Sequence, residues 1–328
     1  MDRVIVTGGA GYVGSHICKV LRGSGFLPIA VDNLITGNKE AVRFGPFAQA
    51  DILDRAALDA VFTKWKPIAV IHMAALTSVE ESVANPKTYW DSNVEGTRNV
   101  VEAMLRHNCL SLVFSSTCAV YGNAASGLVT EDSPVSPESP YAESKLAAEA
   151  LLTEFAKEGD IAPTFFRYFN VAGADPAQEI GEWKKSPSNL IPVALECAAG
   201  DRPEFEIFGM DYPTPDGTCI RDFVHVIDLA DAHVRGLQAT LGGDVGDMFN
   251  IGTGRGNSVR EVIDCCHRVT GVEFTVRESS RRAGDVIRVV SDCAKAGRLL
   301  GWSPANSDLE SMITDAWNWH RGGGFSLR

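Results

Sequence analysis

The sequence lacks several features that would assign it to a specialised class of protein. Basic residues are in the minority, since 30 Lys and Arg face 42 Asp and Glu, and the net charge of −12 argues against a nucleic-acid-binding protein. No apolar run approaches the length of about 18 residues that a membrane-spanning helix needs. The 328 residues, 45% of them hydrophobic and 22% charged, predict one large globular domain or two closely packed ones.

Cysteine motifs and targeting signals are missing as well. The 8 cysteines form no C-x-x-C pair, which argues against a zinc site or a thioredoxin-type motif, and we expect no bound metal. The first apolar stretch, at residues 4–6, is interrupted at once by Gly8 and Gly9, so it is too short for the core of a signal peptide. We therefore expect a cytoplasmic protein whose cysteines are reduced and mostly fill the core.

Short apolar runs alternate with longer amphipathic stretches through the first half of the chain. The runs resemble strands that are buried on both faces, and each gap between them can hold a crossover helix. They cover residues 4–6, 27–31, 69–71, 110–114 and 164–166. After the first run, Val13, Ile17 and Leu21 recur at helical spacing. This alternation predicts an α/β fold with a doubly wound parallel-sheet Rossmann domain.

The alternation ends near residue 171. Residues 172–188 and 209–217 are rich in Gly, Pro and Asp and are expected to be loops. Residues 223–226 predict a strand followed by a helix, and 248–251 predict another short strand. We expect the Rossmann domain to comprise residues 1–171 with a returning segment at about 222–256. Residues 172–221 and 257–328 would form a smaller mixed α/β C-terminal domain that binds the substrate.

A glycine-rich loop, TGGAGYVG at residues 7–14, lies between the first predicted strand and the first predicted helix. A plain tight turn would also use such glycines. The position before a helix, with Asp32 at the end of the next strand, favours dinucleotide binding, because the backbone can approach a pyrophosphate at the helix N-terminus. Asp32 would bind the ribose hydroxyls and repel a 2′-phosphate, which favours NAD over NADP.

Tyr141 and Lys145 share one face of a predicted helix. A free tyrosine has a pKa of about 10, and lowering it to about 7 requires roughly 4 kcal/mol. A nearby ammonium group and an oxidised nicotinamide would both favour the phenolate, so Tyr141 is a candidate general base. The same spacing occurs by chance in surface helices, but the upstream glycine loop favours catalysis. The hydroxyls of residues 115–117 end the fourth predicted strand and could relay a proton or hold a sugar oxygen.

These elements together are similar to the extended short-chain dehydrogenase/reductase superfamily, and the family of UDP-glucose 4-epimerases resembles nearly the whole chain. The matching stretches of the first half include VTGGAGYVGSH, VDNL, VIHMAA, SNVEGT, VFSSTCAVYG, SPYAESK and RYFNVAGA. Those of the second half are SNLIP, IFGMDYPTPDGTCIRDFVHVIDLADAH, NIGTG and RRAGD. The long C-terminal block is specific to epimerases and their nearest relatives, whereas the glycine loop alone is not.

The resemblance implies a role for individual residues. The implied NAD contacts are Gly8, Gly11, Tyr12, Val13, Gly14, Asp32, Asn33, Asp51, Ile52, Ala74, Ala75, Asn93, Ser115, Tyr141, Lys145 and Phe169. The implied catalytic residues are Tyr141, Lys145 and Thr117. The implied UDP-sugar contacts are Thr117, Asn170, Asn189, Leu190, Phe208, Arg221, Arg282, Asp285 and Val289. Two arginines suit a diphosphate, because guanidinium forks grip its oxygens. Arg281 is expected to form only a surface ion pair.

The resemblance also implies an activity and a partner. It implies interconversion of UDP-glucose and UDP-galactose through a transient 4-keto sugar, by a homodimer that retains NAD. The chain departs from the family pattern at four positions: Thr117 replaces a common Ser, Ala75 a Gly and Thr77 a Lys, and Val289 occupies a gatekeeper position. Loss of the Lys removes a ribose contact and is expected to weaken NAD retention. A small gatekeeper is associated with room for an N-acetyl group.

Other functions remain as alternatives. The main one is a 4-epimerase of another UDP-sugar, namely a UDP-N-acetylhexosamine, a UDP-pentose or a UDP-uronate. A 4,6-dehydratase is disfavoured, because Cys118 and Ala119 stand where such enzymes place acidic groups. A non-catalytic NAD-binding regulator is also disfavoured, because a sensor has no need for the base formed by Tyr141 and Lys145.

Overall fold

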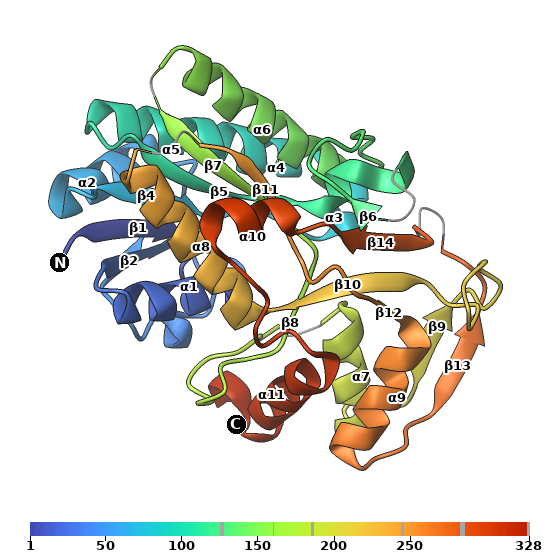
Figure 1. Cartoon of the computed structure of the whole chain (residues 1–328). Coiled ribbons are helices and arrows are strands. Elements are labelled where there is room, and N and C mark those ends of the chain that lie inside the picture. The colour runs from blue at the N-terminus through green and yellow to red at the C-terminus, as the bar shows by residue number, and fades with distance from the viewer. Residues whose placement is uncertain (125–127, 160, 185–186, 244–245, 283–285, 327–328) are drawn as a thin grey trace.

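The computed structural model describes residues 1–124, 128–159, 161–184, 187–243, 246–282 and 286–326 (Figure 1). Its strands are β1 (Arg3–Thr7), β2 (Leu27–Asp32), β3 (Phe47–Gln49), β4 (Ala69–His72), β5 (Ser111–Thr117), β6 (Leu128–Val129), β7 (Ala162–Tyr168), β8 (Asn170–Ala172), β9 (Phe205–Phe208), β10 (Ile220–His225), β11 (Met248–Ile251), β12 (Gly256–Ser258), β13 (Val276–Ser279) and β14 (Arg288–Ser291). Its α-helices are α1 (Tyr12–Gly23), α2 (Arg55–Trp65), α3 (Val79–Ala84), α4 (Pro86–Trp90), α5 (Gly96–Arg106), α6 (Pro140–Lys157), α7 (Leu190–Ala199), α8 (Val226–Leu241), α9 (Val259–Thr270), α10 (Ala294–Leu300) and α11 (Leu309–Arg321).

A seven-stranded sheet in the order β11-β7-β5-β4-β1-β2-β3 forms the centre of the larger part. Every pairing in it is parallel, and Ile5 of β1, for example, lies between Ile29 of β2 and Val70 of β4. All five strands expected in the first half are present. The doubly wound α/β fold predicted from the alternating apolar runs is therefore confirmed.

Helices cover both faces of this sheet, which explains the uninterrupted apolar runs. Val4 and Val6 pack with residues of α1 and α8 on one face, whereas Ile5 packs with residues of α2, α5 and α6 on the other. Figure 1 shows the α1 and α8 pair in front of the sheet and α5 and α6 behind it. The amphipathic spacing seen after β1 belongs to α1, whose Ile17 and Leu21 are fully buried.

The remaining strands form smaller sheets in the C-terminal part. One has the order β12-β10-β14-β6, with β8 also paired to β10, and the other consists of β13 and β9. A separate apolar core is formed by residues of α7, α9, α11 and β9. The chain then returns to the larger part, where α8 packs on one face of the large sheet and β11 joins its edge. The strand before them, β10, lies in the smaller sheet. The strand and helix expected from residue 223 onward are thus β10 and α8.

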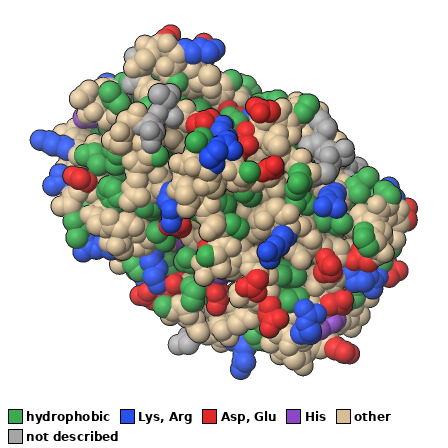
Figure 2. All heavy atoms as spheres, viewed as in Figure 1, with side chains coloured by type: hydrophobic (Ala, Val, Ile, Leu, Met, Phe, Trp, Pro, Cys, Tyr) green, Lys and Arg blue, Asp and Glu red, His purple; other side chains and the backbone are tan. Residues whose placement is uncertain are grey.

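The surface carries charges of both signs, and the cysteines are unpaired. Figure 2 shows acidic and basic side chains interspersed over the face in view. Among the described residues, no helix is long and apolar enough to cross a membrane. All 8 cysteines are free thiols, and most of them are buried.

Candidate active site

The residues predicted for the cofactor converge because the sheet is parallel. Gly8 follows β1, Asp32 ends β2, Ala74 follows β4, Thr117 ends β5 and Phe169 follows β7. The carboxyl ends of parallel strands meet at one edge, where open α/β sheets bind their ligands. Residues that are more than 160 positions apart in the chain are therefore neighbours along this edge.

The glycine loop forms a cradle that side chains would fill. Gly8 has a φ of +67°, in the left-handed region, and a Cβ there would lie 2.8 Å from the backbone nitrogen of Ala74. A Cβ on Gly14 would lie 2.1 Å from the carbonyl oxygen of Gly8. Gly11 precedes α1 without a side-chain cap, so the N–H groups of its first turn can face a ligand. This arrangement fits the pyrophosphate of a dinucleotide.

Acidic side chains lie at the predicted adenosine end of the site. The Asp32 carboxylate accepts hydrogen bonds from the backbone N–H of Ala10 at 3.1 Å and of Leu34 at 2.8 Å. Burial raises the pKa of Asp32, and these two hydrogen bonds act in the opposite direction. Asn33 donates to Asp51 at 2.9 Å, which ties together the two predicted contacts for ribose and adenine. Each oxygen of Asp32 keeps a lone pair for a ribose hydroxyl.

Both amide hydrogens of Asn93 are used within the protein. Its oxygen accepts from the backbone N–H of Leu76 at 2.8 Å, and its nitrogen donates to the Leu76 carbonyl at 3.0 Å and to Ser144 Oγ at 2.9 Å. Asn93 thus fastens the loop containing Ala74 and Ala75 to the helix that carries Tyr141. The amide oxygen keeps one lone pair, so a cofactor could bind Asn93 as an acceptor and not as a donor.

The predicted catalytic helix begins where the sequence indicated. Ser139 caps α6 by accepting from the backbone N–H of Ala142 at 3.2 Å, and Pro140 occupies the first turn. Thr117, which ends β5, lies beside Tyr141. Burial raises the pKa of Tyr141 well above its ordinary value, and the nearby Thr117 hydroxyl partly offsets this. The groups of the chain alone therefore do not lower this pKa as catalysis requires, and a cationic nicotinamide would act in that direction.

Lys145 is almost completely buried one helical turn after Tyr141. Its Nζ lies 4.4 Å from the centre of the Phe114 ring. Burial lowers the pKa of Lys145 from 10.5 to about 7, and the carboxylate of Glu149 opposes this shift. Lys145 is therefore poised to change charge close to neutral pH.

The predicted sugar contacts surround the other side of this region. Arg221 on β10 pairs with Val289 on β14, so the proposed diphosphate arginine and the gatekeeper are adjacent in one sheet. Val289 and Phe169 are buried in one apolar cluster. Asn170 donates to the backbone oxygen of Asp222 at 3.0 Å, which links β8 to β10. These contacts place three of the predicted sugar contacts on the neighbouring strands β8, β10 and β14.

The other predicted sugar contacts lie on α7 and β9. Asn189 precedes α7, which begins at Leu190, and its amide lies 3.4 Å from Glu182. Arg282 stacks over the ring of Phe208, with its guanidinium carbon 4.5 Å from the ring centre. Asp285 lies outside the described residues. Arg281 pairs with Asp211 at 2.7 Å, as expected for a surface ion pair.

Asp222 is an important residue that the sequence argument did not single out. It is fully buried beside Arg221, and its carboxylate accepts hydrogen bonds from Thr253, Gly254 and Ser291. These donors come from the loop after β11 and from β14. The sequence did not reveal this role, because an acidic residue directly after Arg221 can also be interpreted as its partner in a surface ion pair.

A buried ion pair was also missed. Glu149 on α6 binds Arg167 on β7 through two hydrogen bonds, 2.9 Å to Nε and 2.5 Å to Nη2, and it accepts a third from Ser116. Both charged side chains are buried. The helical spacing from Tyr141 to Lys145 to Glu149 was the available signal, since all three residues share one face.

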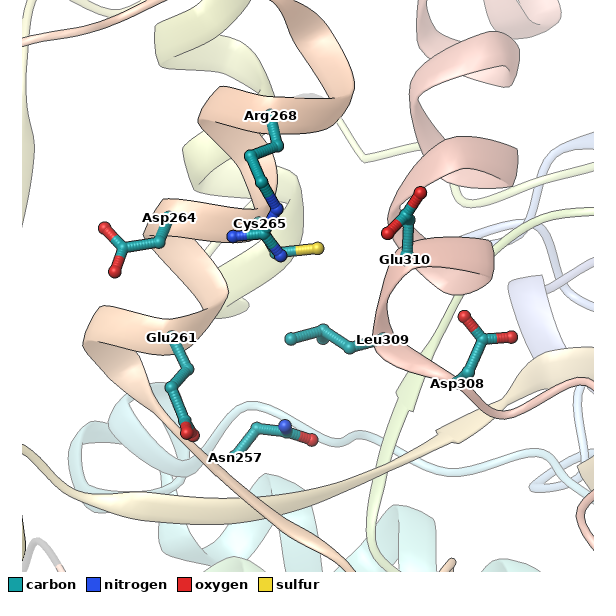
Figure 3. A pocket seen from close by; sticks show the side chains of 8 residues that line it. All are labelled: Asn257, Glu261, Asp264, Cys265, Arg268, Asp308, Leu309 and Glu310. Carbon is teal, nitrogen blue, oxygen red and sulfur yellow. The ribbon is translucent and has the colours of Figure 1, made fainter.

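A surface pocket of about 400 Å³ lies between α9 and α11, and one of its lining residues, Asn257 on β12, is the strand partner of Arg221 (Figure 3). Its charged lining comprises Glu261, Asp264, Asp308, Glu310 and Arg268. Four carboxylates against one guanidinium repel an anionic nucleotide sugar. The charge of this pocket therefore argues against it as the nucleotide-sugar site.

The parallel sheet, the glycine cradle and the Tyr141–Lys145 pair define a dinucleotide-dependent enzyme of the α/β class. A model of the family described as "NAD dependent epimerase/dehydratase family" matches residues 4–252. The chain belongs to this family, and its cofactor is NAD. The matched region spans the large sheet from β1 to β11.

Individual relatives match nearly the whole chain. The UDP-glucose 4-epimerase of Rhizobium leguminosarum bv. trifolii is 43% identical over 319 residues, which are 97% of each chain. The structure of UDP-glucose 4-epimerase from Brucella ovis in complex with NAD has a TM-score of 0.95 and 42% identity, covering 97% of this chain and 98% of that one. The structure of the Stenotrophomonas maltophila enzyme with bound NAD and formylated UDP-arabinopyranose also has a TM-score of 0.95, with 40% identity and 98% of both chains covered.

Proposed function

We propose that the protein interconverts UDP-glucose and UDP-galactose by inverting C4 of the sugar through a transient 4-keto form, with NAD retained. The observation that carries this proposal is the placement of Thr117 beside Tyr141, with buried Lys145 one helical turn further along α6, at the same sheet edge as the glycine cradle. Cys118 and Ala119 provide no acid for elimination of water, which supports epimerisation over dehydration. The relatives named UDP-glucose 4-epimerase support the same reaction.

The proposed proton chemistry uses residues of the chain. When bound in the glycine cradle, NAD would supply the hydride acceptor and donor that the inversion at C4 requires. Tyr141 takes the proton of the 4-hydroxyl and later gives it back, while Thr117 holds the hydroxyl or relays the proton. Burial raises the pKa of Tyr141. A Lys145 ammonium one helical turn away would oppose this effect together with the cationic nicotinamide, because positive charge favours the phenolate.

The proposed substrate anchors hold the nucleotide while the sugar turns over. Arg221 and Arg282 would bind the diphosphate from β10 and from the segment after β13. Asn170, Asn189 and Phe208 would complete the nucleotide site. Anchoring by the diphosphate leaves the sugar free to present either face to the cofactor, as inversion requires.

Proton NMR of UDP-galactose mixed with the purified protein, without added NAD, tests the function. We expect UDP-glucose to accumulate to a fixed ratio, and a Tyr141→Phe preparation to give no conversion, which controls for contaminating enzymes. Turnover only after addition of NAD would keep the function and indicate weaker retention, in line with Thr77 in place of a lysine. No conversion even with added NAD would refute the assignment.

A second candidate substrate is a UDP-pentose. It is supported by the UDP-arabinopyranose derivative bound to the Stenotrophomonas maltophila enzyme. The modest size of Val289 also leaves UDP-N-acetylhexosamines to be tested. Parallel NMR reactions with UDP-xylose and UDP-N-acetylglucosamine would rank these sugars against UDP-galactose.

We further propose that the protein is a cytoplasmic homodimer. The free cysteines fit a reducing compartment. Val79, Val83 and Trp90 expose apolar side chains on α3 and α4, and both helices contact α6. Light scattering coupled to size-exclusion chromatography would test for a mass of twice 35.3 kDa. The division into a Rossmann domain and a substrate domain stays a prediction, to be tested by limited proteolysis.

A further inference from the structure

We propose that Glu149 is a positioning residue for catalysis, and that it acts by keeping Lys145 positively charged and its helix fixed against the strands that carry the site. The inference rests on the proposed function of Tyr141 and Lys145. It adds a buried residue that acts through Lys145 and through the attachment of α6 to β5 and β7.

The first observation is mechanical. Glu149 accepts from Ser116 on β5 and from Arg167 on β7, so one carboxylate joins α6 to both strands. Ser116 immediately precedes Thr117, and Arg167 lies two residues before Phe169. The carboxylate is therefore attached within two residues of groups predicted to contact substrate and cofactor. Charge-assisted, bidentate bonds of this kind set a specific geometry as well as adding energy.

The second observation concerns the charges around Lys145. The titratable groups around Lys145 and its immediate partners are Tyr141 and Glu149 on α6, His72 on β4, and, beside Glu149 and Tyr141, Arg167 and Tyr168 on β7. Burial lowers the pKa of His72 to about 3 and raises that of Tyr168 to about 12, and in the chain without NAD it also raises that of Tyr141, so none of these three is charged at pH 7 before the cofactor binds. Of the five groups, the ion pair alone carries charge, and its carboxylate is one helical turn from Lys145.

The two observations together give Glu149 a specific task. An ammonium group in a buried site loses its proton readily unless a carboxylate stands nearby. Arg167 and Ser116 hold that carboxylate in place, so it cannot turn away from the helix face it shares with Lys145. Loss of the negative charge should therefore make Lys145 deprotonate at a lower pH.

The experiment compares pH profiles of kcat/KM for UDP-galactose at saturating NAD. Glu149→Gln keeps the size of the side chain and removes its charge, and we expect the alkaline limb to move to lower pH by about one unit. Glu149→Asp keeps the charge and alters the hydrogen-bond geometry. The alkaline limb of its pH profile should therefore remain in place, although its kcat/KM falls. Glu154→Gln, which removes an exposed carboxylate from the same helix, is the matched control and should leave the profile unchanged.

The outcomes separate this inference from the proposed function. An inactive wild-type protein would refute the function itself. An active wild type whose alkaline limb stays in place in Glu149→Gln, or moves equally in Glu149→Asp, would overturn the role of Glu149. If Glu149→Gln does not fold because Arg167 is left unpaired, the double variant Glu149→Gln/Arg167→Met removes both charges. Its limb should still move to lower pH, and an unmoved limb would refute the inference.

Discussion

Replacing Asp222 by Asn should destabilise the protein, although the two side chains have nearly the same shape. The carboxylate accepts from the backbone N–H groups of Thr253 at 2.8 Å, Gly254 at 3.1 Å and Ser291 at 3.0 Å, and from two hydroxyls. An amide presents one acceptor and one donor, so at least one of these donors would face an N–H group. The remaining bonds would lose the assistance of a full charge.

The magnitude follows from the number of bonds. Hydrogen bonds to charged groups contribute about 1.5–3 kcal/mol each and neutral ones about 1 kcal/mol, so weakening five of them should lower the free energy of unfolding by at least about 3 kcal/mol. Ala at this position would leave five buried donors without their acceptor, at about 1–3 kcal/mol each, so the loss should be at least about 5 kcal/mol. Because Arg221 is the neighbouring residue on β10, the affinity for UDP should fall as well.

Urea unfolding at constant NAD concentration measures the first effect, and calorimetric titration with UDP measures the second. Asp231→Asn is the matched control, because this half-exposed carboxylate pairs with Arg235 on the surface of α8 and should contribute less than about 1 kcal/mol. If Asp222→Asn unfolded within 0.5 kcal/mol of the wild type, roughly the change of a neutral surface substitution, the reasoning would be refuted.

Three further predictions concern catalysis, specificity and pH. Tyr141→Phe should lower kcat by roughly 10²–10⁴-fold while UDP affinity by calorimetry stays unchanged, and unchanged turnover would exclude Tyr141 as the base. Val289→Tyr should reduce turnover of UDP-N-acetylglucosamine far more than that of UDP-galactose, and an equal loss would argue against a gatekeeper role. Burial lowers the pKa of His16 and His233 to about 4 and that of His72 to about 3. Because the unfolded chain binds these protons at about pH 6.5, stability should fall as the pH drops from 6.5 towards 4, by up to about 3 kcal/mol per histidine. His233→Leu should make the urea midpoint less dependent on pH over this window, and an unchanged slope would contradict that.

The parts of the fold that could be predicted from sequence are those with strong local patterns. β1 and β4 are continuous apolar runs because helices cover both faces of the sheet. Such a run can be recognised in the sequence without knowing which strands lie beside it. Ser139 and Pro140 mark the start of α6, because serine is a favoured N-cap residue and proline is favoured in the first helical turn. The glycine loop could be predicted because its glycines stand between a predicted strand and a predicted helix.

The short strands of the C-terminal part could not be predicted in this way. β9 and β13 have four residues each and pair with one another across about 70 residues of sequence. β12, with the sequence GNS, has no apolar residue at all. Such strands exist because tertiary pairing satisfies their backbone groups, and this signal is not local.

The site shows the same division. Tyr141 and Lys145 could be found from spacing on one helix, and their neighbours along the sheet edge followed from the parallel topology. Asp222 and the Glu149–Arg167 pair depend on contacts between elements far apart in the chain. The use of both Asn93 amide hydrogens by Leu76 and Ser144 depends on such contacts too. The resemblance predicts that Asn93 contacts the cofactor, but the sequence could not show that these two hydrogens already have acceptors.

The position of β11 at the end of the large sheet has a consequence for biosynthesis. β7 is complete at Tyr168, yet its outer neighbour ends at Ile251, roughly 80 residues later. At about 5–20 residues per second, the ribosome needs on the order of 4–16 s to deliver the missing strand. During this interval β7 is an open edge, and Phe166 waits for its contacts with Phe249 and His233. The nascent chain therefore passes through a period in which it is prone to aggregate, and a ribosome that stalls before Ile251 would leave a sheet that pairs with other chains.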